Sequence, residues 1–158
     1  MSLMNSAHRR ITVLALCMCL AAACTPSATP KEETLPTFML GGFEDDYGIQ
    51  YQIDEQLFQM APSDKFHILS IHPAESFLIL QNDSLNSFAP ALFTRIDYQK
   101  LENMDPYEWA FCFSSFEAKS IEEAIDSVKT QKTDLMKGCN GYPFSRMIRV
   151  EKPKEETP

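Results

Sequence analysis

The feature that most constrains this chain is a short apolar run close to its N-terminus. Residues 1–10 contain no acidic residue and end in Arg9 and Arg10, and residues 11–23 (ITVLALCMCLAAA) are uncharged and mostly apolar. A run of this length is too short to span a bilayer, which requires about 20 residues. A basic start, a short apolar run and a small-residue end are typical of an export signal. We therefore expect residues 1–23 to be a signal peptide, so that only the rest of the chain folds.

The end of this run, Leu20-Ala21-Ala22-Ala23-Cys24, resembles the lipobox of bacterial lipoproteins, although that family usually has Leu where Ala21 stands. The resemblance implies cleavage before Cys24 and acylation of its sulfur and new amino group. Two or three acyl chains hold a protein stably at a membrane. The absence of Asp after Cys24 resembles outer-membrane sorting in Gram-negative hosts, so we expect an envelope protein anchored there. The alternative is ordinary secretion after the same small residues.

The cysteine count supports export. The chain has five cysteines, of which Cys17 and Cys19 leave with the signal peptide and Cys24 is consumed by lipid. Cys112 and Cys139 remain, and a single pair in an oxidising compartment predicts one disulfide. Two cysteines cannot complete a zinc site unaided, so we expect neither a metal nor another cofactor.

Charge restricts the partners. The formal charge is −8, and loss of Arg9 and Arg10 would bring the mature chain to about −10. This balance argues against binding nucleic acid or docking electrostatically on anionic lipid. It permits a basic partner, although acidity often serves only solubility.

The mature chain is long enough for one domain. An apolar fraction of 44% and an aromatic fraction of 11% predict a packed globule. We expect a lipidated cysteine and flexible tether over residues 24–39, a single domain over 40–150, and a disordered tail over 151–158.

Alternating apolar residues predict strands along most of this domain, and the clearest alternation is in residues 48–54 (GIQYQID). The expected strands cover residues 48–54, 57–60, 65–72, 76–81, 91–98, 107–114 and 146–150. Residues 40–48 contain three glycines and an acidic pair and are expected to form a turn. One helix is expected from the capping box of Ser120 and Glu123 to about Leu135, with Gly138 ending it.

The order of these elements predicts an α+β fold. Short connections favour an antiparallel meander of about five to seven strands with one helix packed on one face. A strong twist could curl this sheet into a small barrel or a half-barrel.

Two groups of residues are candidates for a ligand or partner surface. Arg95 and Asp97 lie two apart on one expected strand and share a face, as a structural ion pair or a binding site. Asn140, Tyr142 and Arg146 belong to a turn-rich loop after Cys139, which either presents a recognition surface or closes one end of the sheet.

The remaining polar candidates have plainer alternatives. Asp45 and Asp46 could bind a cation, but the distal Glu of calcium loops is absent and a solvated turn is favoured. His67 and His72 lack metalloprotease spacing and are expected on the surface or satisfied locally. Asn82 and Asp83 are polar groups at a strand break. The aromatic residues at period two, Tyr107, Trp109, Phe111 and Phe113, line either a core or a pocket.

These patterns contain no catalytic motif, and Ser145 lacks the G-x-S-x-G setting. Residues 40–147 resemble exported bacterial proteins, a resemblance that implies no particular activity. We therefore expect a non-enzymatic domain that binds a protein or a small ligand at the envelope.

Three alternatives remain. The first is an inhibitor or immunity-type protein against a basic enzyme such as a lysozyme. The second is a hydrolase that uses two of Asp45, Asp46, His67 and His72 within about 3–4 Å of each other. The third is a barrel with an internal ligand cavity of about 300 Å³ or more.

Overall fold

The structure is a computed structural model that describes residues 33–127 and 130–150. The expected signal peptide, Cys24 and the expected disordered tail lie outside these residues. The described elements are η1 (Thr37–Met39), β1 (Gly41–Asp45), β2 (Gln50–Ile53), β3 (Leu57–Met60), β4 (Asp64–His72), β5 (Phe77–Asn82), β6 (Phe93–Lys100), β7 (Tyr107–Ala118), α1 (Ile121–Asp126) and β8 (Ser145–Arg149).

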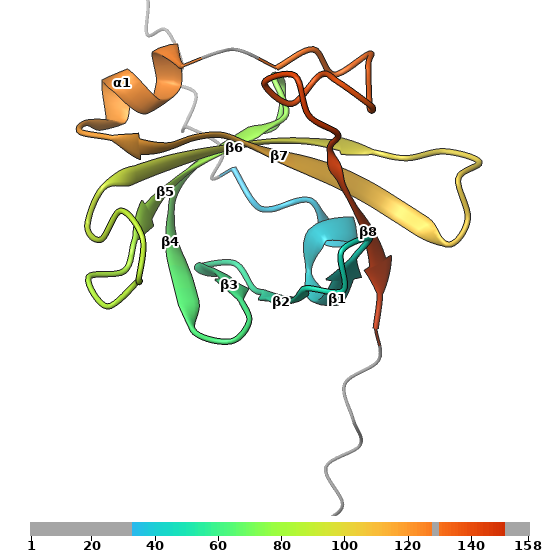
Figure 1. The fold of residues 1–158 in the computed structure, drawn as a ribbon, viewed down its shortest axis with the longest axis horizontal. Coiled ribbons are helices and arrows are strands. Elements are labelled where there is room, and N and C mark those ends of the chain that lie inside the picture. The colour runs from blue at the N-terminus through green and yellow to red at the C-terminus, as the bar shows by residue number, and fades with distance from the viewer. Residues whose placement is uncertain (1–32, 128–129, 151–158) are drawn as a thin grey trace, which may run out of the picture. The chain divides into compact units, whose positions relative to one another are not determined.

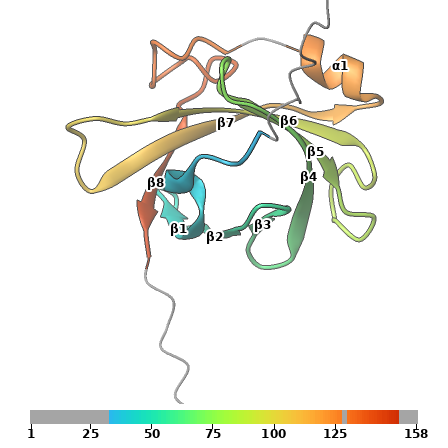
Figure 2. The same cartoon turned by 180° about the vertical axis from the view of Figure 1, so that it is seen from behind.

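The eight strands form a closed antiparallel barrel in simple chain order (Figures 1 and 2). Each strand pairs with the next, and β8 returns to pair with β1 from Phe43↔Arg149 to Asp45↔Met147. The expected antiparallel meander with one helix is confirmed. The sheet has one strand more than the expected five to seven, and of the two curled forms that were expected the structure has the closed barrel.

The additional strand is β1, which lies where a turn was expected. Within residues 40–48, only the stretch after Asp45 turns, and Gly41–Asp45 is extended. Phe43 points into the interior and is fully buried. Gly41 has φ of +119°, a conformation that side chains rarely adopt. Pairing with β8 supplies the stability that a segment of two glycines and two acids lacks by itself.

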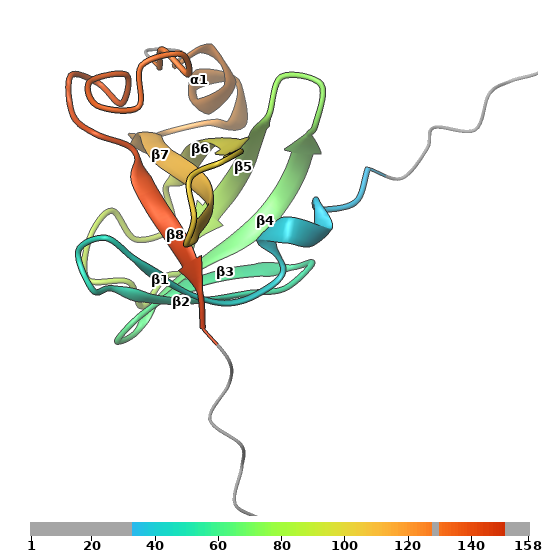
Figure 3. The same cartoon turned by 90° about the vertical axis from the view of Figure 1, so that its right-hand side faces the viewer.

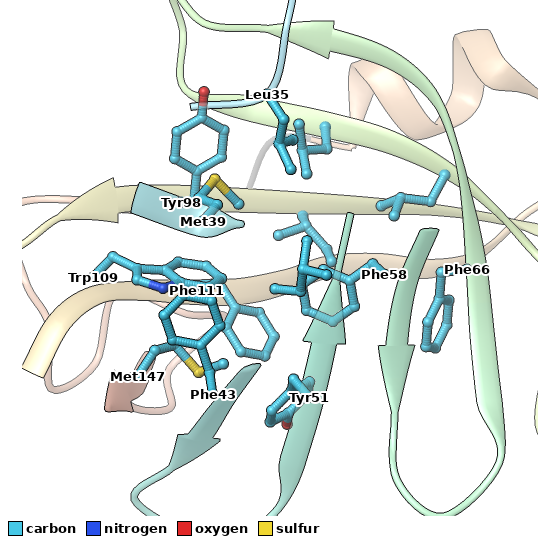
Figure 4. Packing of buried hydrophobic residues seen from close by; sticks show 14 residues of the cluster. Leu35, Met39, Phe43, Tyr51, Phe58, Phe66, Tyr98, Trp109, Phe111 and Met147 are labelled. Carbon is cyan, nitrogen blue, oxygen red and sulfur yellow. The ribbon is translucent and has the colours of Figure 1, made fainter. Parts of the chain in front are cut away.

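Aromatic side chains fill the barrel (Figure 4). The rings of Tyr51, Phe58 and Phe111 meet edge to face with centroids 5.5–5.6 Å apart. Trp109 packs edge to face on Phe43 at 5.4 Å. Eight strands enclose an interior just wide enough for side chains. Side chains thus occupy the space in which the ligand-holding alternative requires a cavity.

The chain's own N-terminal segment closes one mouth of the barrel (Figure 3). Leu35 and Met39 are 2% and 0% exposed and belong to the interior cluster. Arg149 donates hydrogen bonds to the carbonyl oxygens of Phe38 and Leu40 at 3.1 and 2.8 Å. We call residues 35–40 the N-terminal plug. The expected flexible tether over residues 24–39 is therefore wrong in its last five residues, because Leu35 and Met39 have apolar surface to bury.

The outer faces of β5, β6 and β7 carry a second layer. Ala124 of α1 is buried in a cluster with Phe77 and Ile79 of β5 and Ala118 of β7. The sequence FLILQ therefore contributes to two cores, one on each face of the sheet. Helix packing on the sheet is confirmed. No described helix has the length and apolar character that crossing a membrane requires.

The helix itself is shorter than expected. It begins as expected, with the backbone N–H of Glu123 donating to Ser120 Oγ at 3.2 Å. It ends at Asp126 and not near Leu135. Instead, Gln131 and Gly138 form a turn in which the N–H of Gln131 donates to the carbonyl of Gly138 at 2.8 Å. Tertiary contacts override the helical pattern there.

The predicted disulfide between Cys112 and Cys139 is confirmed, with Cα atoms 5.5 Å apart. It joins the outer face of β7 to the connection between α1 and β8. Phe144 and Ala110 pack beside it in a small separate cluster with Leu101. The disulfide thus ties the covering layer to the barrel.

Candidate functional site

Arg95 and Asp97 form a buried ion pair on the outer face of β6. Arg95 Nε and Nη2 donate to the two oxygens of Asp97 at 2.9 and 3.0 Å, a bidentate geometry. Arg95 Nη1 donates to the carbonyl of Ile125 at 2.6 Å, which holds α1 against the sheet. The guanidinium lies 3.8 Å from the ring centroid of Phe77. The pair expected on this strand is thus present and underlies the outer layer.

Two further side chains complete the environment of Asp97, which is fully buried. Ser114 Oγ donates to Asp97 Oδ2, and Lys132 Nζ lies 3.2 Å from Asp97 Oδ1. Burial alone would raise the pKa of Asp97, but the hydrogen bonds from Arg95 and Ser114, with the charges of Arg95 and Lys132, hold that pKa below its usual value. Asp97 is therefore a stable anion at neutral pH.

A pocket of about 610 Å³ lies over this pair. On its wall the imidazole of His72 stacks on Phe77 with centroids 4.1 Å apart. The two cations that line the pocket, Arg95 and Lys132, already have partners. Besides Asp97, Lys132 Nζ donates to the carbonyl oxygens of Glu75 and Ser76. These contacts hold the covering layer. Arg95 and Asp97 both line the pocket, so a ligand or partner surface at this pair stays a prediction.

Asp45 has a structural role that the expected solvated turn does not describe. It is only 3% exposed. Its Oδ1 accepts from the backbone N–H groups of Tyr47 and Ile49 at 3.0 and 2.9 Å. Its Oδ2 accepts from the hydroxyl of Tyr51 at 2.9 Å. Burial, followed by this hydrogen bond, raises the pKa of Tyr51 well above its usual value. Asp45 therefore fixes the β1–β2 turn.

The other residues of the hydrolase alternative are dispersed. Asp46 pairs with Arg146 Nε at 2.9 Å. His67 Nε2 lies 2.8 Å from Asp83, and His72 Nε2 lies 3.0 Å from Ser70 Oγ. These contacts do not assemble an acid–base pair from Asp45, Asp46 and the two histidines. Within residues 33–127 and 130–150, no three His, Cys, Asp or Glu side chains lie close enough to hold a metal ion.

The loop after Cys139 was expected either to close one end of the sheet or to present a recognition surface, and its residues include examples of both. Asn140 adopts φ of +52° and directs its Nδ2 to the carbonyl oxygens of Phe113 and Ser114, at 3.5 and 3.3 Å. Arg146 pairs with Asp46 and also lies 4.3 Å from the ring centroid of Tyr107. These two residues close the side of the sheet. Tyr142 is 72% exposed and makes up the part of this loop that faces solvent together with Asn140, which is exposed despite these hydrogen bonds.

An exposed apolar surface on the rim of the barrel was not predicted from the sequence. Leu85 and Phe88 of the β5–β6 loop are 91% and 56% exposed, and Phe116 near the end of β7 is 42% exposed. The rings of Phe88 and Phe116 are in contact, with centroids 5.3 Å apart. We call Leu85, Phe88 and Phe116 the rim surface. Clustered exposed apolar side chains mark interaction sites more reliably than single ones.

A buried amide holds the rim surface in place. Asn82 is 2% exposed, and its Nδ2 donates to the carbonyl oxygens of Ala89 and Phe116 at 2.8 and 3.0 Å. Its Oδ1 accepts from Thr94 Oγ1. One side chain thus binds the β5–β6 loop to β7, so that the two phenylalanines are displayed on a fixed backbone. The sequence signal was available in Leu85 and Phe88, which are apolar residues in a loop without strand alternation.

Two depressions flank the rim surface. One, of about 380 Å³, lies between Leu85 and the β3–β4 turn at Pro62 and Ser63. The other, of about 610 Å³, lies between Phe116 and Asn140. A β-bulge separates Arg95 from Ile96 in the β6–β7 register, and a second separates Phe93 from Arg95. Bulges at barrel rims re-aim side chains, which accounts for the outward exposure of Phe116.

No family model matches this chain, and neither a curated protein nor a solved structure matches it.

Proposed function

We propose that this protein is a lipid-anchored component of the bacterial envelope that binds a protein partner, without catalysis, through its rim surface. The observation that carries the proposal is the contact between Phe88 and Phe116, which are both exposed and both fixed by Asn82. Rigid aromatic side chains dominate binding energy at protein interfaces. Depressions on both sides of the surface can receive side chains of the partner.

The rim surface lies at the rim of the barrel opposite the N-terminal plug. In a meander, the β1–β2, β3–β4 and β5–β6 connections lie at one rim, and the N-terminal plug enters at the opposite rim (Figure 3). A chain held to a membrane through Cys24 would be tethered on the plug side. The rim surface is at the other rim of the barrel, away from the point where the chain enters it.

The charge of the chain favours a basic partner. A formal charge of −8 accelerates encounter with a cationic protein and repels anionic ones. Inhibition of a basic enzyme such as a lysozyme is the narrower form of this proposal, and complex formation that weakens with salt would support it.

The lipid anchor is tested by intact-mass analysis of the protein extracted from membranes. The expected mass is that of residues 24–158 plus two or three acyl chains. The Cys24→Ser variant is expected to lose the acyl mass and leave the membrane fraction, because no sulfur remains to be acylated. An unmodified Cys24 on a released protein would contradict the proposal.

The docking surface is tested by placing a photoreactive phenylalanine analogue at position 88 in cells. Illumination is expected to yield a discrete adduct with a basic protein, and the additional Phe116→Ala substitution is expected to reduce its yield at least tenfold, because the partner's anchor is lost. The control position is Leu69, which is 45% exposed and lies on β4 outside the rim surface. Equal adducts from both positions, or none from position 88, would refute this surface.

A further inference from the structure

Two polar atoms in the barrel have no hydrogen-bond partner among the described residues. They are Tyr98 Oη and Trp109 Nε1, on side chains that are 3% and 0% exposed. A buried donor without an acceptor is costly and uncommon, and therefore calls for an explanation. Burial raises the pKa of Tyr98, so its hydroxyl remains protonated and available as a donor.

Both side chains lie beside the N-terminal plug. The ring of Phe38 is 6.3 Å from that of Tyr98 and 6.5 Å from that of Trp109, and Figure 4 shows both residues close to Met39. The two aromatic rings that carry these donors thus lie next to the part of the interior that the plug occupies. A ligand that entered there would bring acceptors within their reach.

The N-terminal plug, unlike the strands that supply the rest of the core, is not held by strand pairing. It contains a single 3-10 turn, Thr37–Met39, and no strand, so its withdrawal breaks none of the strand pairing that closes the barrel. Its polar contacts are few: Arg149 binds the carbonyl groups of Phe38 and Leu40, and the N–H of Leu35 donates to Glu55 at 3.2 Å. The barrel can therefore stay closed while the plug leaves.

We propose that the space filled by the plug is a binding site for a fatty acyl chain with a carboxyl or ester head. The acyl chain replaces the side chains of Leu35, Phe38 and Met39, and the head oxygens accept hydrogen bonds from Tyr98 Oη and Trp109 Nε1. An unbranched acyl chain suits the site because the side chains that it replaces are all apolar and belong to or pack against the interior cluster. The plug competes with the ligand, so it acts as a built-in gate. This site is at the opposite rim from the proposed docking surface and does not depend on it.

The first test uses the mature chain with Cys24→Ser, which removes its own acyl groups, and the fluorescent fatty acid cis-parinaric acid as probe. We expect saturable binding of one probe per chain. We also expect amide exchange at Met39 and Leu40, whose N–H groups bond within the plug, to accelerate at least tenfold on saturation. Absence of binding, or binding that leaves these two amides protected, overturns the proposal.

The second test removes one donor at a time. Tyr98→Phe removes only the hydroxyl and keeps the ring, whereas Trp109→Phe removes Nε1 together with part of the indole. Tyr98→Phe and Trp109→Phe are each expected to weaken parinarate binding about tenfold, as loss of a hydrogen bond to a charged head does. Tyr98→Phe is not expected to lower the melting temperature of the free protein, because its hydroxyl has no partner there. Trp109→Phe also removes buried apolar atoms, so a lower melting temperature of that variant reports lost packing and not the lost donor. Leu85→Ser on the rim surface is the matched control and should bind the probe unchanged. Unaltered affinity in both ring variants overturns the assignment.

Discussion

Replacing Asp97 by Asn is expected to lower the free energy of unfolding by about 3–5 kcal/mol. The substitution keeps the shape of the side chain but leaves Arg95 and Lys132 without their shared anion. Arg95 is 4% exposed, so water cannot replace the lost carboxylate. Urea denaturation followed by tryptophan fluorescence measures the loss, because the single Trp109 lies in the core.

The matched control is Glu108→Gln. Glu108 pairs with Arg149 at 2.8 Å, but both side chains are more than a third exposed. Exposed pairs typically contribute about 0–1 kcal/mol, so this variant should differ little from the wild type. Equal losses from Asp97→Asn and Glu108→Gln would show that burial does not set the cost.

The same residue gives the wild type a dependence on pH. Because the pKa of Asp97 is lower in the folded protein than its usual value of about 3.9, its contribution is fully present above about pH 4. It is lost as the pH falls through the folded-state pKa. Asp97→Asn should therefore show a smaller loss of stability between about pH 4 and pH 2 than the wild type, by urea denaturation at each pH.

Removing the disulfide is expected to have the second large effect. Cys112 and Cys139 are separated by 27 positions, and loop entropy predicts a loss of about 3–4 kcal/mol in the Cys112→Ala, Cys139→Ala double variant. The connection between α1 and β8 should then detach from β7 before the barrel unfolds, which amide exchange in the Gln131–Gly138 turn would report. Cys24→Ser, which changes no described contact, is the control for loss of a cysteine. A loss below about 1 kcal/mol would contradict this account.

The strands that were predicted correctly are those whose alternation of apolar and polar residues can be read from neighbouring residues alone. The expected strands over residues 57–60 and 65–72 agree with β3 and β4 to within one residue, because alternation along each strand reflects one buried face. β1 was missed because its pairing with β8 joins residues about 100 positions apart. Closure of the barrel depends on that pairing, so the local pattern could not decide between a half-barrel and a closed barrel.

The candidate site was predicted in part, for similar reasons. Arg95 and Asp97 were identified as a pair from their spacing, but their burial was not, because it depends on α1 and Lys132 arriving from elsewhere in the chain. The early end of α1 at Asp126 has a similar cause, because tertiary contacts after that residue override the helical pattern. The rim surface joins Phe88 and Phe116 across two elements, and no spacing rule relates them.

The pairing of β1 with β8 also constrains the order in which the molecule can mature. Register partners such as Phe43 and Arg149 span nearly the whole domain, and contacts of such long range slow folding. If the chain emerges from a translocation channel N-terminus first, β1 stays an open edge until β8 is released. Open edges invite pairing with other chains. β1 therefore keeps one unpaired edge from the time it forms until the last strand, β8, is available to pair with it.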